Sequence, residues 1–153
     1  MNWKLDTGNI QLTNLSHVGI VVKDAEKTTK WLSTIWNIGK PDITDYEPQK
    51  EEVFVGEPFK VRIVSIKFGA FPIELLQPQD NKSIWSKFLA EKGEGIHHFA
   101  LGISNYEEMV AKMQKQKHPL LVAGIFKGER WCYFDTNPGG TVIEFREEYN
   151  KKV

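Results

Sequence analysis

The chain has 153 residues, of which 41% are hydrophobic, and its 20 basic and 20 acidic residues give a formal net charge of zero. This balance gives no support to a nucleic-acid partner or a charged membrane patch, and the chain has no apolar run of about 18 residues that could span a membrane. The length predicts a single domain over residues 1–153. The single cysteine, Cys132, excludes an internal disulfide and, with no apolar signal segment at the start, predicts a cytoplasmic protein.

Hydrophobic periodicity predicts the same order of elements in both halves of the chain. The first half has these predicted elements: a strand over 15–23, a helix over 25–36, and strands over 53–55, 60–68 and 71–76. The polar stretch before residue 52 is either a loop or an edge strand, and a short helix over 84–90, ending at Gly93, links the halves. The second half has these predicted elements: a strand over 95–104, a helix over 106–117, and strands over 120–126, 130–134 and 141–146. We therefore expect an α+β fold of two βαβββ modules, 15–78 and 95–148, that form a cleft.

A strand that begins with a histidine occurs twice. The ten residues that start at His17 align with the ten that start at His98, and each segment contains a helix N-cap residue, Asp24 or Asn105. In both copies the histidine shares its strand face with a Gly or Ala, while large apolar residues occupy the other face. The small neighbours leave space beside each imidazole, which suits a ligand or a metal. The alternative is a histidine that is simply hydrogen-bonded in the core or at its rim.

Each half also ends in a strand with one carboxylate between large apolar residues. Glu74 lies in Ile-Glu-Leu and Glu144 in Ile-Glu-Phe, so each carboxylate faces away from its apolar neighbours. Together with His17 and His98 they form a donor set suited to one divalent metal ion, with waters completing six-coordination. The alternative is that both carboxylates pair with Lys or Arg on solvated faces. The repetition of one His and one Glu in each half favours the metal.

Alternation also distinguishes the two adjacent histidines of the second half. His98 shares its face with two small residues and aligns with His17, so it is the predicted ligand. His97 shares its face with Phe99 and Leu101, which predicts a position behind the ligand or at the strand edge.

Four segments together resemble the vicinal oxygen chelate superfamily, which includes glyoxalase I, methylmalonyl-CoA epimerase, bleomycin-resistance proteins and extradiol dioxygenases. The segments are 15–22 (LSHVGIVV), 72–78 (PIELLQP), 95–100 (GIHHFA) and 135–145 (DTNPGGTVIEF). Within the superfamily the chain most resembles the methylmalonyl-CoA epimerase group, which has a similar Ile-Glu-Leu-Leu-x-Pro and a similar Gly-x-His-His.

This resemblance implies paired βαβββ modules around a cleft, with a metal held by His17, Glu74, His98 and Glu144. The implied cofactor is one divalent ion, and the residues do not distinguish Co, Mn, Ni, Zn, Mg and Fe. The resemblance further implies a small carbonyl or acyl-CoA substrate and a homodimer. The epimerases carry an acidic base ahead of the third strand. Here Glu57 is near that place within a different pattern, so Glu57 and Glu144 are both candidate bases and the substrate stays open.

Three functions agree with these residues. The first is a metal-dependent isomerase, epimerase or lyase, in which a carboxylate removes an α-proton and the metal stabilises the enolate; Glu74, as a fourth ligand, favours it. The second is an Fe(II) ring-cleaving dioxygenase that uses His17, His98 and Glu144, with Glu74 as a bystander. The third is a non-catalytic protein that binds an aromatic or antibiotic-like ligand in the cleft.

Overall fold

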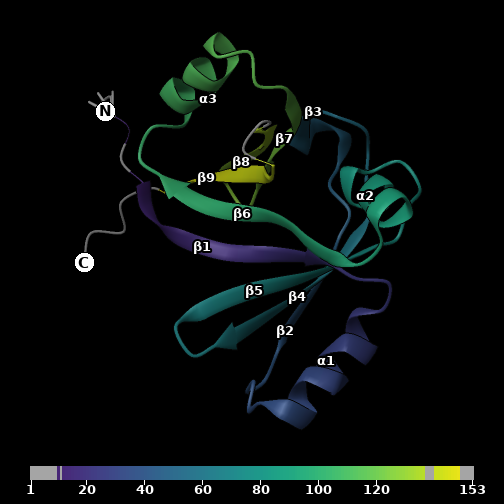
Figure 1. Cartoon of the computed structure of the whole chain (residues 1–153). Helices are drawn as coiled ribbons and strands as arrows, with labels where there is room; N and C mark the ends of the chain where they lie inside the picture. The colour runs from purple at the N-terminus through teal and green to yellow at the C-terminus, as the bar shows by residue number, and fades with distance from the viewer. Residues whose placement is uncertain (1–9, 11, 137–139, 149–153) are drawn as a thin grey trace.

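The structure is a computed structural model that describes residues 10, 12–136 and 140–148. Within these residues, nine strands form one mixed sheet and three α-helices pack against it (Figure 1). The helices are α1 (Ala25–Ile35), α2 (Ile84–Lys92) and α3 (Tyr106–Lys115). The strands are β1 (Leu12–Val21), β2 (Asp42–Tyr46), β3 (Val53–Val55), β4 (Val61–Phe68), β5 (Phe71–Pro78), β6 (Gly95–Ile103), β7 (Leu120–Phe126), β8 (Glu129–Asp135) and β9 (Val142–Glu147).

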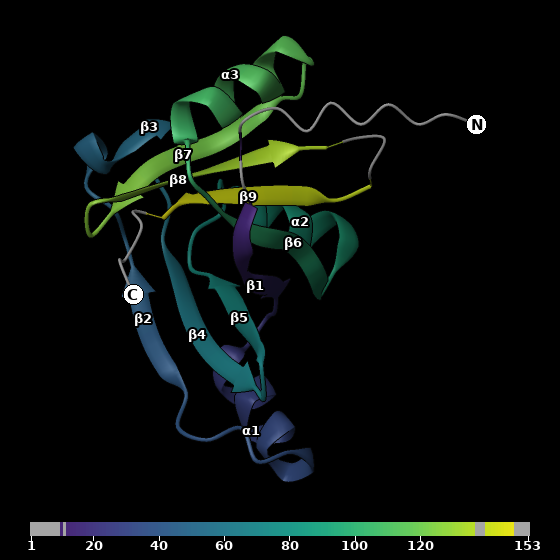
Figure 2. The same cartoon turned by 90° about the vertical axis from the view of Figure 1, so that its left-hand side faces the viewer.

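The sheet contains two βαβββ modules side by side. Its strand order is β2-β4-β5-β1-β6-β9-β8-β7-β3, and the first strands of the two modules, β1 and β6, pair antiparallel. Because β1 is parallel to β5 and β6 is parallel to β9, the two modules have the same internal order. In Figure 2 the strands of the first module run across those of the second, so the sheet bends where the modules meet. The predicted α+β fold of paired βαβββ modules is confirmed.

Side-chain alternation gives each module one face covered by a helix and one face turned toward the cleft. The core under α1 contains Val22, Ala25, Leu32, Ile38, Val64, Ile66 and Leu75. The core under α3 contains Ile103, Tyr106, Met109, Met113, Ala123, Cys132, Phe134 and Phe145. A third core lies between the inner faces beside α2 and contains Val21, Phe59, Val61, Leu76, Trp85, Val122, Trp131 and Tyr133. The outer-face cores therefore fix the strands of each module, while the inner-face positions outside the third core are left to form a site.

Local sequence signals explain where the helices begin and end. Asp24 and Asn105 cap α1 and α3, each accepting a hydrogen bond from the backbone N–H three residues later, at 2.9 and 3.1 Å. Such side-chain caps satisfy N–H groups that have no partner inside the helix. α2 ends at Gly93, whose φ of 80° lies in the region that glycine adopts without steric cost. The aligned caps therefore start the helix of each module at the same point after its histidine strand.

The region between α1 and β4 differs from the expected arrangement. Of the two alternatives for the polar stretch, the edge strand forms, as β2. The strand over 53–55 also forms, but as β3 it pairs with β7 of the second module, Val53 opposite Gly124. A Cβ atom at Gly124 would lie 2.4 Å from the backbone oxygen of Glu52, so glycine permits this close crossing. Residues 47–60 therefore bridge the two modules.

Two further expectations concern the turn between the last two strands and the membrane. The predicted turn over 135–140 includes residues 137–139, which lie outside the described residues. Among the helices of the described part, none is both long and apolar enough to cross a membrane.

Candidate metal centre

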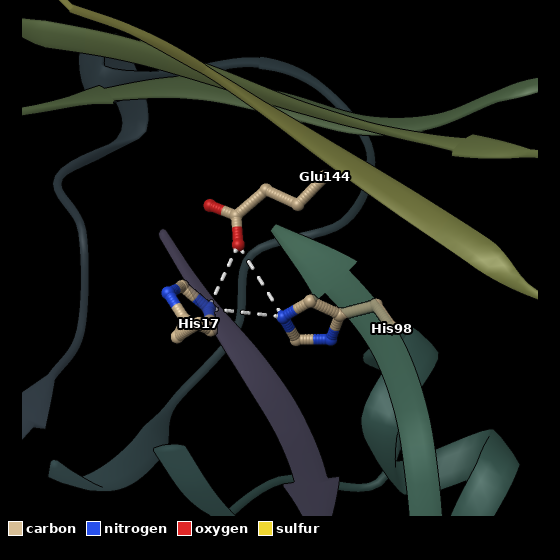
Figure 3. Close-up of side chains that lie close together, drawn as sticks. All are labelled: His17, His98 and Glu144. Atoms are coloured by element: carbon tan, nitrogen blue, oxygen red, sulfur yellow. Dashed lines mark hydrogen bonds and ion pairs between the residues drawn. The ribbon is translucent and has the colours of Figure 1, made fainter. Parts of the chain in front are cut away.

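The backbone register brings both predicted histidine ligands and Glu144 to one point of the sheet. Ala100 on β6 pairs with His17 of β1 on one side and with Glu144 of β9 on the other. His98 lies two residues before Ala100 on the same strand and therefore faces the same side. Figure 3 shows the three side chains converging from three strands. Because β1 and β9 belong to different modules, the cluster depends on both.

The three donor atoms are spaced like ligands around one ion. His17 Nε2 lies 3.2 Å from His98 Nε2 and 3.2 Å from Glu144 Oε2, and His98 Nε2 lies 3.3 Å from Glu144 Oε2. Ligands about 2.1 Å from one ion lie about 3.0 Å apart at right angles and about 3.4 Å apart at the tetrahedral angle. All three side chains are buried. Their geometry and donor types therefore fit a divalent metal ion.

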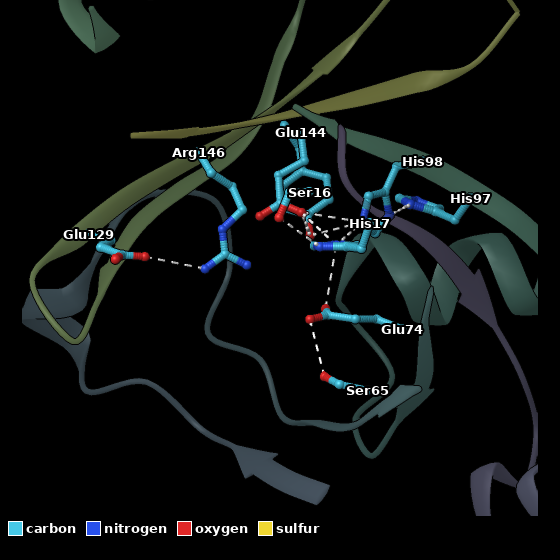
Figure 4. Close-up of polar contacts among 10 residues, drawn as sticks. Ser16, His17, Ser65, Glu74, His97, His98, Glu129, Glu144 and Arg146 are labelled. Atoms are coloured by element: carbon cyan, nitrogen blue, oxygen red, sulfur yellow. Dashed lines mark hydrogen bonds and ion pairs between the residues drawn. The ribbon is translucent and has the colours of Figure 1, made fainter. Parts of the chain in front are cut away.

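Glu74, the fourth predicted ligand, approaches the cluster from the first module. Its Oε2 lies 3.4 Å from His17 Nε2, and its Oε1 accepts a hydrogen bond of 3.3 Å from the Ser65 hydroxyl (Figure 4). It lies outside the set of groups that are within 4.8 Å of one another, which contains only His17, His98 and Glu144 among the described residues. The structure thus brings three predicted ligands together and places the fourth against His17.

Gly19 provides the space that the His98 ring occupies. Gly19 pairs with Glu74 of β5 on one side and with His98 of β6 on the other. A Cβ atom at this position would lie 2.0 Å from Cε1 of His98. The small residue beside the first histidine therefore makes room for the imidazole of the second. This is the physical reason for the small residue that follows His17 on the same face.

His97 contacts His98 instead of facing the opposite side of the strand. The pairing of β6 with β1 shifts register between Gly19 and Ile20, and this irregularity turns His97 inward. Its Nδ1 lies 3.0 Å from Nδ1 of His98, and its ring packs edge-on against Phe88 of α2. The strict alternation expected from the sequence is wrong at this residue. His97 lies directly behind the predicted ligand, and a His98 that coordinates through Nε2 would donate its Nδ1–H to His97.

Tyr133 is a member of the site that the sequence did not identify. It pairs with Glu144 across the hairpin, and its hydroxyl donates a 3.0 Å hydrogen bond to Glu144 Oε2. The same hydroxyl lies 3.5 Å from His98 Nε2. Alternation along the predicted strand over 130–134 already places Tyr133 on the face of the strand opposite to that of Cys132 and Phe134. The missing information was the register of the β8–β9 hairpin.

Burial and charge set the protonation states of the cluster. Burial disfavours the charged form of His17, but the hydrogen bond and negative charge of Glu144, together with Glu74, outweigh it and raise the pKa of His17. Burial opposes ionisation of Glu144, but hydrogen bonds with His17 and His98 hold its pKa well below the usual value. Burial lowers the pKa of His97 to about 3, and electrostatic repulsion from His98 is the second cause. Burial and the nearby carboxylates raise the pKa of Tyr133, so its phenol stays a neutral donor.

A cavity of about 230 Å³ opens beside the cluster between the two modules. Its polar end is lined by Ser65, Glu74, Glu144 and Arg146, and Asp42 and Lys127 also line it. Its other wall consists of the aromatic side chains Tyr46, Phe59, Trp85, Phe126, Trp131 and Tyr133. Arg146, two residues after Glu144 on the same strand face, is a second site residue that the sequence analysis missed.

Glu57, the other candidate base, lies away from this cavity. It is exposed and lines a smaller hollow beside Ser83 and Lys87. The two hollows share Phe59 and Trp85 in their walls, so these side chains lie between Glu57 and the cluster. The structure therefore does not bring Glu57 together with the predicted ligands.

We expect Tyr133→Phe to weaken metal binding about 10- to 100-fold, the usual cost of losing a hydrogen bond to a ligand. The substitution keeps the ring in the core and removes only the donor to Glu144. Calorimetric titration of the metal-free protein with Co²⁺ measures the change in affinity. Tyr106→Phe is the matched control, because its hydroxyl bonds to the Trp131 carbonyl oxygen at 3.3 Å, outside the cluster. Equal affinities in the two variants would show that Tyr133 does not support Glu144.

Metal affinity should rise with pH. The raised pKa of His17 means that the metal-free cluster keeps a proton at and above pH 6.5, and an ion must displace that proton. Affinity should therefore fall about tenfold per pH unit below the raised pKa and level off above it. Calorimetry at pH 6 to 8, in two buffers with different ionisation enthalpies, should show one proton released per ion at the lower pH. A flat profile without proton release would contradict the assignment.

Comparison with known proteins supports the same architecture. Residues 16–134 match the model of the Glyoxalase/Bleomycin resistance protein/Dioxygenase superfamily. A methylmalonyl-CoA epimerase from Mycobacterium tuberculosis is similar with a TM-score of 0.63 and 25% identity, over 92% of this chain and 91% of that chain. A Streptomyces coelicolor methylmalonyl-CoA epimerase variant in complex with 2-nitronate-propionyl-CoA has a TM-score of 0.66 at 20% identity, over 90% of this chain and 99% of that chain. No protein of curated function matches the sequence.

Proposed function

Because the chain belongs to the Glyoxalase/Bleomycin resistance protein/Dioxygenase superfamily, we propose that it is a divalent-metal-dependent isomerase, epimerase or lyase that removes an α-proton from a carbonyl or acyl-CoA substrate. The observation that carries the proposal is the buried His17–His98–Glu144 cluster at the polar end of a cavity between the two modules. Glu74 would complete the ligand set from the first module. The similarity to methylmalonyl-CoA epimerases supports the choice of an acyl-CoA thioester as one substrate class.

The chain's own residues supply the remaining requirements of α-proton removal. A divalent ion held by the cluster would stabilise the negative charge that develops on the carbonyl oxygen as the proton leaves. Glu144 is the proposed base, because it remains ionised at neutral pH and lines the cavity. Tyr133 orients its carboxylate through the 3.0 Å hydrogen bond. The aromatic wall limits access of water to the reacting carbon.

Hydrogen exchange tests this function. The metal-loaded protein in D₂O should exchange the α-hydrogen of a 2-substituted acyl-CoA thioester or of a hemithioacetal for deuterium. Mass spectrometry measures the deuterium that the compound takes up. The exchange should stop when a chelator removes the metal and should consume no oxygen. Glu144→Gln should abolish it, whereas Glu57→Gln should retain it, because Glu57 lines a different hollow. Metal-loaded protein that exchanges none of these compounds would contradict the proposal.

A second function is favoured by one specific observation. The mutually close groups are two histidines and one carboxylate, the ligand set of many Fe(II) oxygenases, and Glu74 lies outside that set. We propose an Fe(II) ring-cleaving dioxygenase as the alternative. Protein loaded with Fe(II) without oxygen, then mixed with a catechol in air, would consume oxygen if this alternative holds. Oxygen uptake together with absent hydrogen exchange would replace the first proposal.

A further inference from the structure

The acidic and basic side chains that line the cavity determine its charge when a divalent ion is present. Three carboxylates and two cations line it: Asp42, Glu74, Glu144, Lys127 and Arg146. Their net charge is therefore negative by one, and a divalent ion makes it positive by one. Because a histidine that coordinates an ion carries no proton charge, the loaded cavity favours a substrate that carries one negative charge.

Arg146 is the cation placed to receive that charge. Its side chain is 26% exposed, and its closest ion pair among the described residues is Nη2 to Glu129 Oε2 at 3.6 Å, which is too long for a hydrogen bond. The other arginines are engaged: Arg62 bonds to both Asp45 oxygens at 2.7 and 2.9 Å, and Arg130 bonds to Glu147. Figure 4 shows the Arg146 guanidinium between Glu129 and the cluster. Its free donors can bind a carboxylate through two parallel hydrogen bonds.

One wall of the cavity is apolar and consists of packed aromatic rings. Phe59 lies edge-on to Trp85 at 5.0 Å and to Trp131 at 5.9 Å between ring centroids. Tyr46 contacts Phe59 at 5.4 Å and Phe126 at 4.6 Å. These rings therefore support one another, and the parts of them that line the cavity form a wall suited to a flat apolar group. A cavity of about 230 Å³ has room for such a group on a small substrate.

We propose that the substrate is a carbonyl compound with one carboxylate, bound by Arg146, and an aromatic or similarly bulky apolar group, held by the aromatic wall. This inference rests on the proposed function, because it describes the substrate of the same site. Glu144 lies two residues before Arg146 on β9 and is hydrogen-bonded to Tyr133 of the aromatic wall, so the carbonyl of a substrate bound at both subsites falls beside the predicted metal ligands. A substrate with only a methyl group would leave the aromatic wall uncovered.

Three related compounds test the two subsites separately. Phenylpyruvate has both groups, pyruvate lacks the ring, and phenylacetone lacks the carboxylate. We expect the Co²⁺-loaded protein to bind phenylpyruvate about tenfold or more tightly than pyruvate, because only the former buries a ring, and about 10- to 100-fold more tightly than phenylacetone. Isothermal titration calorimetry gives the three dissociation constants. Equal binding of phenylpyruvate and phenylacetone, or no binding of phenylpyruvate at millimolar concentration, overturns the proposal.

Substitution of the arginine assigns the carboxylate preference to one residue. Arg146→Met should weaken phenylpyruvate binding about 10- to 100-fold and leave phenylacetone binding unchanged. Arg62→Met is the matched control, because Arg62 bonds to Asp45 and does not line the cavity. Metal content is measured first in each variant, so that loss of the ion is not mistaken for loss of the carboxylate site. An unchanged phenylpyruvate affinity in Arg146→Met rejects the assignment. If this variant does not fold, the three-compound comparison on the unsubstituted protein still tests the proposed substrate class.

Binding and hydrogen exchange separate the two proposals. Selective binding of phenylpyruvate without α-hydrogen exchange of any compound would reject the proposed reaction and keep this substrate class. Metal-dependent exchange of a thioester that binds equally well to the Arg146→Met variant would reject the substrate class and keep the reaction.

Discussion

His98→Ala should reduce metal affinity by more than about 100-fold, beyond the usual cost of changing a residue behind a ligand. His98 is fully buried, and its Nε2 lies within 3.3 Å of both other donors of the cluster. No neighbouring imidazole can replace it, because His97 approaches from the far side of the ring, through Nδ1. Metal content after equilibrium dialysis against Co²⁺, compared with the unsubstituted protein, measures the loss.

His97→Ala distinguishes a ligand from the residue behind it. Its Nδ1 lies 3.0 Å from Nδ1 of His98 and would accept the Nδ1–H of a His98 that coordinates through Nε2, so we expect affinity to fall about 10- to 100-fold, clearly less than in His98→Ala. His118→Ala, outside the cluster, should leave the metal content unchanged. Thermal unfolding of each metal-free variant shows whether a change reflects the fold. Equal losses in His97→Ala and His98→Ala would reject the assignment of His98 as the ligand.

The positions that follow regular alternation were predictable, because each residue's neighbours determine its strand face. Glu74 and Glu144 lie on regular stretches of strand, and the structure places both on the cleft side. His17 reaches the same cluster although the register of β1 against β6 shifts just before it. His97 broke the rule because its orientation depends on a register shift between β6 and β1, which are 81 residues apart at their histidines. The sequence of one strand does not determine where its pairing with a distant strand shifts register.

Residues that complete the site from other strands required knowledge of long-range register. Tyr133 and Glu144 face one another only because the hairpin pairs them, and Arg146 matters only because the cavity forms beside it. The loop that carries Glu57 was the least predictable part. Its path depends on β3 joining the second module through the close crossing at Gly124, a contact between distant segments.

Gly19→Ala should disrupt the metal site although residue 19 supplies no ligand. A Cβ atom there would lie 2.0 Å from Cε1 and 2.4 Å from Nδ1 of His98, so the imidazole must move. The ring cannot move freely, because His98 is fully buried against Tyr133 and His97. We expect metal affinity to fall by more than about 100-fold, as in His98→Ala, and the free energy of unfolding to fall by about 1–3 kcal/mol from overpacking. Calorimetric titration with Co²⁺ and urea unfolding measure the two effects.

Two companion variants identify the cause. Gly95→Ala, near the start of β6, adds the same methyl group where no heavy atom lies within 4 Å, so it should leave metal affinity unchanged and stability equal or slightly higher. In a His98→Ala background the colliding ring is absent, so Gly19→Ala should then cost much less stability than it does alone. If the cost is the same in both backgrounds, the effect of the added methyl group comes from the β1 backbone and not from its collision with His98.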